Sequence, residues 1–155
     1  MVKEQMDAQA YNNCGNAKSE VGYYRSAIED YDKAIELNPK YALAYHNRGI
    51  AKRKLGDYKG AIADYDKAIE LNPNFADAYN NRGIAKGKLG DHKGAIADYD
   101  KAIRINPKDA EAYYNRGYAK ADLGDHKGAI ADCDKAIELN PKYAEAYYKR
   151  GYANI

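Results

Sequence analysis

A sequence period of 34 residues runs through most of this chain of 155 residues. The stretch GDYKGAIADYDKAIELNP, which begins at Gly56, recurs with few changes from Gly90 and from Gly124, and a looser copy begins at Gly22. Proline closes every copy at the same interval, at Pro39, Pro73, Pro107 and Pro141. Self-similarity at such a period indicates a stack of small, nearly identical units, none of which buries its apolar face alone.

Each period predicts two helices joined by a tight turn. Residues 42–55 predict the first helix, Gly56 breaks it, and Asp57 is a suitable N-cap for the second. The second helix carries an apolar stripe at helical spacing and ends at Asn72, because a residue before proline avoids the helical region. No segment has the pattern of a β-strand. We therefore expect an all-α fold built from stacked αα-hairpins.

Composition narrows the class of protein further. The chain is 45% apolar and 31% charged with a formal charge of +2, and a nucleic-acid-binding protein would show a basic stripe. No run approaches the roughly 18 apolar residues of a membrane span, and the polar start lacks the apolar core of a signal peptide. Cys14 and Cys133 lie in the first and fourth copies, too far apart to meet in an elongated array. We expect a cytoplasmic protein that binds neither nucleic acid nor membrane.

Several recurring positions together resemble the tetratricopeptide repeat family. They are an aromatic residue four before Gly in the first helix, Leu-Gly-Asp at the turn, Ala–x₃–Tyr–x₂–Ala in the second helix, and the closing Pro. The resemblance implies a right-handed solenoid of αα-hairpins, in one domain with a tail at 1–7 and a terminal helix at 144–155. The four full repeats would be 8–41, 42–75, 76–109 and 110–143.

One departure from the family is a row of Arg where Leu is usual, at Arg48, Arg82, Arg116 and Arg150. An Asp row lies on the second helix of each preceding unit, at Asp30, Asp64, Asp98 and Asp132. Since each second helix is expected to pack on the next first helix, we predict four ion pairs between repeats. They are Asp30–Arg48, Asp64–Arg82, Asp98–Arg116 and Asp132–Arg150, and they would set the stacking register.

The sequence offers little support for catalysis or for a metal site. Cys133 stands at the position of Tyr31 and its equivalents, and Cys14 stands in the Arg row, so both cysteines occupy structural positions. His92 and His126 replace Tyr near the turn, but no Cys or acidic ligand joins them at zinc spacing. We expect no enzymatic activity, no cofactor and no metal.

A row of asparagines is the best candidate for binding, at Asn13, Asn47, Asn81 and Asn115. The resemblance implies that first helices line a concave surface along which extended peptides lie, and similar Asn ladders occur in the family. A carboxamide both donates and accepts, so such a ladder would hold a peptide backbone whatever its sequence. The alternative is that Asn at this position only bonds neighbouring helices, since buried amides need partners in any case.

Variable positions of the same helices would then select side chains. The expected contacts are Ile50, Ile84, Tyr114, Tyr118 and Tyr152, with positive charge from Arg53 and Lys88. We predict a non-enzymatic scaffold that binds an extended peptide or protein segment in the concave groove. The alternative is a structural or self-associating array, natural fragment or engineered, with no ligand of its own. The uncovered terminal helix also predicts weak self-association.

Overall fold

A computed structural model of the protein describes residues 6–142, which form eight α-helices and no β-strand. The chain divides into two compact units, Met1–Pro73 and Asn74–Ile155. The first unit contains α1 (Ala8–Glu20), α2 (Tyr24–Leu37), α3 (Ala42–Lys54) and α4 (Tyr58–Leu71). The second contains α5 (Ala76–Lys88), α6 (His92–Ile105), α7 (Ala110–Asp122) and α8 (His126–Leu139). The predicted all-α class is confirmed.

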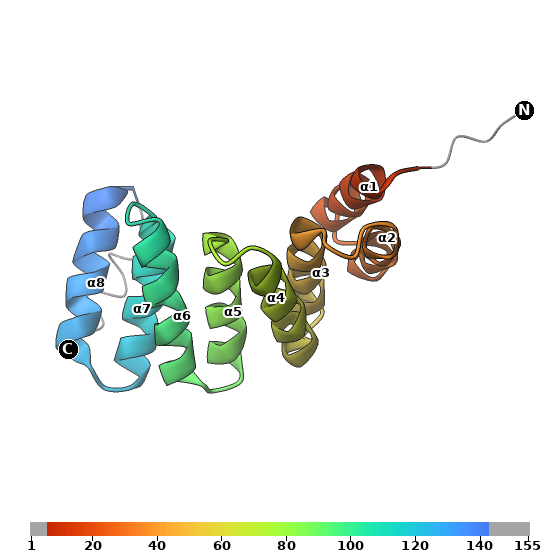
Figure 1. Ribbon diagram of the computed structural model, residues 1–155. Coiled ribbons are helices and arrows are strands. Elements are labelled where there is room, and N and C mark those ends of the chain that lie inside the picture. The colour runs from red at the N-terminus through yellow and green to blue at the C-terminus, as the bar shows by residue number, and fades with distance from the viewer. Residues whose placement is uncertain (1–5, 143–155) are drawn as a thin grey trace, which may run out of the picture. The chain divides into compact units, whose positions relative to one another are not determined.

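Each unit consists of two stacked αα-hairpins. In the first unit α1 packs against α2 and α3 against α4, and α2 contacts α3. In the second unit α5 packs against α6 and α7 against α8, and α6 contacts α7 (Figure 1). Contacts are therefore made between helices that are near in sequence, as a repeat architecture requires.

The turn inside each hairpin follows the expected chemistry. Gly56 has φ +85, in the left-handed region that glycine enters without steric cost. The next residue, Asp57, is the N-cap of α4, and its Oδ1 accepts a hydrogen bond of 2.9 Å from the Gly60 backbone N–H. At the other end Asn72 leaves the helix with φ −140. Both helix ends therefore lie where the sequence predicted them.

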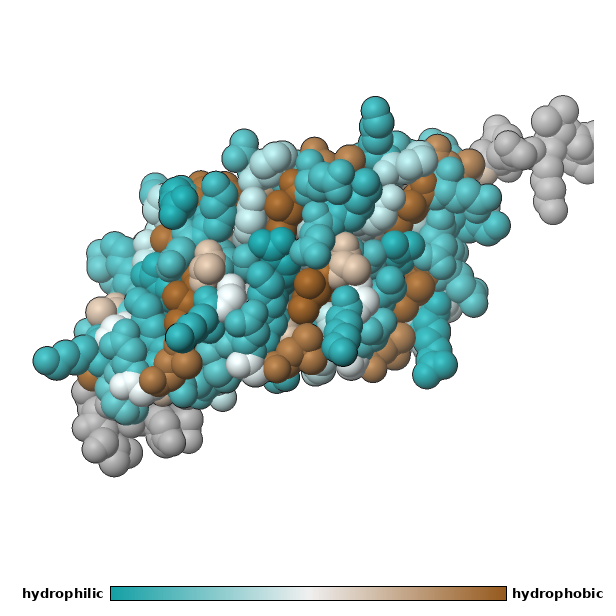
Figure 2. All heavy atoms as spheres, turned by 60° about the horizontal axis from the view of Figure 1, so that its bottom comes forward, coloured by the Kyte–Doolittle hydropathy of each residue, from teal (hydrophilic) through white to brown (hydrophobic). Residues whose placement is uncertain are grey.

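The core between paired helices is made of small residues and tyrosine rings. Ala27, Ala61 and Ala95 on the second helices are fully buried. A Cβ on Gly49 would lie 2.7 Å from Cε1 of Tyr65, so this ring packs directly on the bare glycine backbone. On the face shown in Figure 2, hydrophobic side chains form narrow stripes between hydrophilic ones. Close approach of the helices, made possible by Ala and Gly, thus provides much of the burial.

The predicted partners of Arg48 and Arg116 are wrong. Arg48 Nε and Nη2 donate to both carboxylate oxygens of Asp64, at 2.9 and 2.7 Å, inside one repeat. Asp30, the partner predicted for Arg48, pairs instead with Lys18 at 2.8 Å. In the second unit Arg116 likewise pairs with Asp132 and not with Asp98. Arg82 pairs with Asp98, and Arg150 lies outside the described residues.

A different aspartate joins one repeat to the next. Arg48 Nη1 donates to Asp32 at 2.8 Å, and Arg116 Nη1 donates to Asp100 at 2.9 Å. The two aspartates of each Asp-Tyr-Asp triplet are about 200° apart around the helix, at about 3.6 residues per turn. The first therefore faces its own hairpin and the second faces the following one, which is why the prediction chose the wrong member.

No helix among residues 6–142 has both the length and the apolar character needed to cross a membrane. The terminal helix predicted at 144–155, its Tyr152 and the self-association expected from it lie outside the described residues.

Candidate functional site

A groove in the second unit is the candidate site. Its volume is about 490 Å³, and it is lined by residues of α5, α6 and α7. The α5 wall carries Ile84, Gly87 and Lys88, and the α6 wall carries His92, Ala95 and Tyr99. The α7 wall is formed by Tyr114, Asn115, Tyr118, Ala119 and Asp122. The groove thus joins one hairpin to the first helix of the next.

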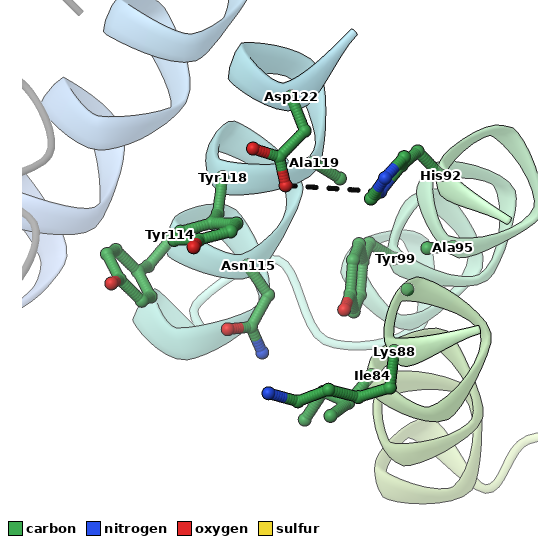
Figure 3. A pocket seen from close by; sticks show the side chains of 11 residues that line it. Ile84, Lys88, His92, Ala95, Tyr99, Tyr114, Asn115, Tyr118, Ala119 and Asp122 are labelled. Atoms are coloured by element: carbon green, nitrogen blue, oxygen red, sulfur yellow. Dashed lines mark ion pairs between the residues drawn. The ribbon is translucent and has the colours of Figure 1, made fainter. Parts of the chain in front are cut away.

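Polar groups approach the groove from facing walls. In Figure 3 the side chains of Lys88 on α5 and Asn115 on α7 both point into it. At another edge of the groove His92 Nδ1 lies 4.0 Å from Asp122 Oδ2, which joins the start of α6 to the end of α7. On the α7 side of the groove Tyr114 and Tyr118 meet edge to face, with ring centroids 6.4 Å apart. The site therefore combines an aromatic wall with a cation and a carboxamide.

Five of the eleven residues predicted for binding line this groove, namely Ile84, Lys88, Tyr114, Asn115 and Tyr118. Asn81 lies on α5 but does not line the groove. Asn13, Asn47, Ile50 and Arg53 belong to the first unit, on α1 and α3. The structure therefore brings together five predicted residues from the third and fourth repeats, and four others lie in the first unit.

The asparagine row makes contacts between repeats. Asn47 Nδ2 donates to Asn12 Oδ1 at 3.1 Å, and Asn115 Nδ2 donates to Asn80 Oδ1 at 3.3 Å. Both bonds join first helices of successive hairpins. These are the bonds expected from the alternative interpretation, in which the amide holds a neighbouring helix. The bond to Asn80 also fixes the orientation of the Asn115 carboxamide within the groove wall.

Six groove residues were not predicted for binding, and Gly87 is the most informative. A Cβ at Gly87 would meet only Ala95 Cβ, at 4.0 Å, so the space beside it is open. The corresponding residue one repeat earlier is Arg53. Repeats two and three differ at few positions. The replacement of the long Arg53 side chain by Gly87 is the difference in the sequence that indicates a groove in the third repeat.

Arg53 shows what a long side chain does at that position. Burial raises the pKa of the Tyr65 hydroxyl, and the adjacent Arg53 guanidinium partly offsets that rise. The Nε atom of Arg53 is itself buried, so this long side chain is packed within its own repeat near Tyr65. Within residues 6–142, no three His, Cys, Asp or Glu side chains are arranged to hold a metal ion.

Stacked hairpins of this length, each with a Gly turn and three of them with a tyrosine ring packed on a glycine, define an αα-hairpin repeat protein. Profiles of the tetratricopeptide repeat match at 20–54, 51–90, 87–124 and 110–143. The chain belongs to the tetratricopeptide repeat family. No curated protein sequence matches it significantly.

Solved structures of MamA are similar over almost the whole chain. Two MamA crystal structures are each 28% identical with a TM-score of 0.84; they cover 94% and 97% of this chain and 80% and 84% of their own. MamA from Desulfovibrio magneticus RS-1 is 26% identical with a TM-score of 0.86, over 95% of this chain and 83% of that one.

Proposed function

We propose that this protein is a non-enzymatic scaffold that binds an extended segment of another protein in the groove of α5, α6 and α7. The observation that carries the proposal is the groove itself, which places Lys88, Asn115 and the Tyr114–Tyr118 pair around one space. Its volume of about 490 Å³ falls within the usual range of binding pockets, about 300–1,000 Å³. Membership of a family of interaction modules supports the same conclusion.

In this proposal Asn115 and Tyr118 contact different parts of the bound segment. Asn115 uses an N–H on Asn80, and its carbonyl oxygen then accepts a backbone N–H of the segment. Tyr118, with 46% of its surface exposed, offers a ring that loses little freedom when a ligand side chain packs on it. In this proposal Asn115 alone, held by Asn80, contacts the backbone of the segment, instead of the row of asparagines expected from the sequence.

The test begins with selection of peptides from a random display library on the full chain. Tyr118→Ala and Asn115→Ala are then measured with the selected peptide. A central anchor contributes more than 1 kcal/mol, so the Tyr118 variant is expected to weaken binding by about tenfold. Tyr23→Ala is the matched control, because Tyr23 is also exposed (65%) but lies in the first unit.

Two outcomes would contradict the proposal. Selected peptides that bind all three variants equally would place the binding surface elsewhere. A library that yields no peptide, together with assembly that increases with protein concentration in sedimentation, would favour the alternative, a self-associating array with no ligand of its own.

A further inference from the structure

In each of the first three repeats, one position of the first helix lies twelve residues before the buried tyrosine of the second helix. In the first repeat this position is Ser19, whose Oγ lies 3.2 Å from the Tyr31 hydroxyl. In the second it is Arg53, whose Nε is buried and whose guanidinium charge acts on the Tyr65 hydroxyl. The protein's own side chain therefore occupies this space in the first two repeats.

The third repeat has Gly87 at that position and leaves the space to the groove. Gly87, Ala95 and Ala119 form a floor of small residues, and Tyr99 lines the same groove. The open volume next to Gly87 corresponds to the side chain that Arg53 has and Gly87 lacks. Ile84 and Tyr118 supply apolar surface at the sides, so a bulky apolar group fits the space.

The charged side chains of the groove lie at separate edges. Asp122 lies near His92, whereas no carboxylate among the described residues pairs with Lys88. The Lys88 ammonium and the Asp122 carboxylate therefore lie at different edges of the groove, and an anionic group of a ligand is favoured beside Lys88.

We propose that Gly87 makes the third repeat a side-chain pocket, which seats one bulky apolar side chain of the bound segment with a carboxylate beside it on Lys88. This inference rests on the proposed function and assigns the class of segment: an aromatic or large aliphatic residue next to an acidic group. Gly87 determines which side chains enter, and Lys88 determines the preferred charge.

The smallest probe with both features is N-acetyl-L-phenylalanine, titrated into the full isotope-labelled chain and followed by NMR. We expect saturable shifts of the Gly87 amide and of the Ala95 and Ala119 methyl groups. For a probe of this size the dissociation constant is expected to be about millimolar. N-acetylglycine, which lacks the ring, should not produce these shifts.

Two variants separate the pocket from the charge. Gly87→Arg restores the side chain of the second repeat and is expected to weaken binding at least about tenfold, whereas Gly87→Ala keeps the pocket and the binding. N-acetyl-L-phenylalaninamide should bind about two- to fivefold more weakly than the acid, and Lys88→Gln should abolish that difference. The spectrum of each free variant reports whether it is folded.

The outcomes distinguish this inference from the proposed function. Absence of saturable shifts, or equal binding by Gly87→Arg, would overturn the pocket even if library peptides bind elsewhere in the groove. Equal affinity for acid and amide would overturn the role of Lys88. Saturable, Gly87-dependent binding of the probe would support the pocket, even if the library yields no longer segment and the scaffold proposal fails.

Discussion

At the scale of single residues, Arg48 and Arg116 of the arginine row are each held by three groups. In the first unit the Arg48 guanidinium lies 5.5 Å from the centre of the Tyr45 ring, pairs with Asp64 of its own hairpin and reaches Asp32 of the preceding one. Arg116 repeats the arrangement, and its pKa is raised chiefly by the hydrogen bond to Asp132. One side chain thus joins two helices of a hairpin and two hairpins of a unit.

The pair Arg48–Asp64 should be strongly coupled in stability, and Arg48–Asp30 should not. Asp64→Asn is expected to lower the free energy of unfolding by about 3 kcal/mol, because Asp64 is 4% exposed and Arg48 and Lys52 lose their shared carboxylate. A double-mutant cycle with Arg48→Gln, measured by urea unfolding, should give a coupling of about 0.5–3 kcal/mol. The cycle with Asp30→Asn serves as control and should be additive within about 0.5 kcal/mol.

Two buried tyrosines predict a loss of stability at high pH. Burial raises the pKa of Tyr31 above its ordinary value of 10.0, and burial likewise raises the pKa of Tyr65. A raised pKa in the folded state means that the contribution is complete below pH 10 and is lost as pH rises through the folded value. Urea unfolding of the Tyr31→Phe, Tyr65→Phe variant between pH 8 and 11 should show a flatter decline than the parent.

Tyr23→Phe is the control for that experiment, because Tyr23 is exposed and its decline should match the parent. At neutral pH Tyr31→Phe also loses the 2.7 Å bond to Asn16, at a cost of about 1 kcal/mol. A decline that does not change in the double variant would mean that other groups cause it.

At the scale of the element, α5 contains two glycines with opposite roles. Gly83 lies under the Tyr99 ring, where an added Cβ would be 2.6 Å from Cε1. Gly87, one turn later, has only Ala95 Cβ at 4.0 Å. Close helix packing requires the first glycine, whereas the second makes room for the groove.

Alanine at these two positions should therefore change stability in opposite directions. Gly83→Ala is expected to destabilise by about 1–3 kcal/mol, because the buried ring must move. Gly87→Ala should stabilise by about 0.5–1 kcal/mol through helix propensity. Thermal unfolding of both variants measures the difference, and a loss of stability at both positions would show that Gly87 is also needed for packing.

At the scale of the whole molecule, contacts within each unit join only helices near one another in sequence. The stability of such an array is approximately a sum of contributions from single repeats and from contacts between neighbouring repeats. A destabilising substitution should therefore affect only the helices close to it. This local response distinguishes a repeat array from a domain with a single core.

Hydrogen exchange should show that locality. Asp132→Asn removes the carboxylate that pairs with Arg116 at 2.6 Å and Lys120 at 3.0 Å, and should reduce amide protection in α7 and α8. Protection in α1 and α2 should be unchanged, as measured by mass spectrometry of peptic peptides. A uniform loss in all helices would contradict the nearest-neighbour description.

Much of the fold could be predicted from the sequence because it depends on local rules. The turn at Gly56 and the N-cap at Asp57 depend on residues within a few positions, and the 34-residue repetition shows them several times. The arrangement as one solenoid domain stays a prediction, since the structure describes each unit by itself. For the site, about half of the predicted residues line the groove, because repeat position indicates which helix face a residue occupies.

The sequence by itself determined the repeat, the helix pairs and their ends, since period, glycine turns and proline stops act on neighbouring residues. Only the tertiary structure decided which aspartate meets which arginine, because Asp30 and Asp32 differ by a rotation around one helix that the sequence period does not reveal. It also decided where the groove lies. Whether a missing side chain at Gly87 leaves a space or is filled by a neighbour depends on packing across three helices.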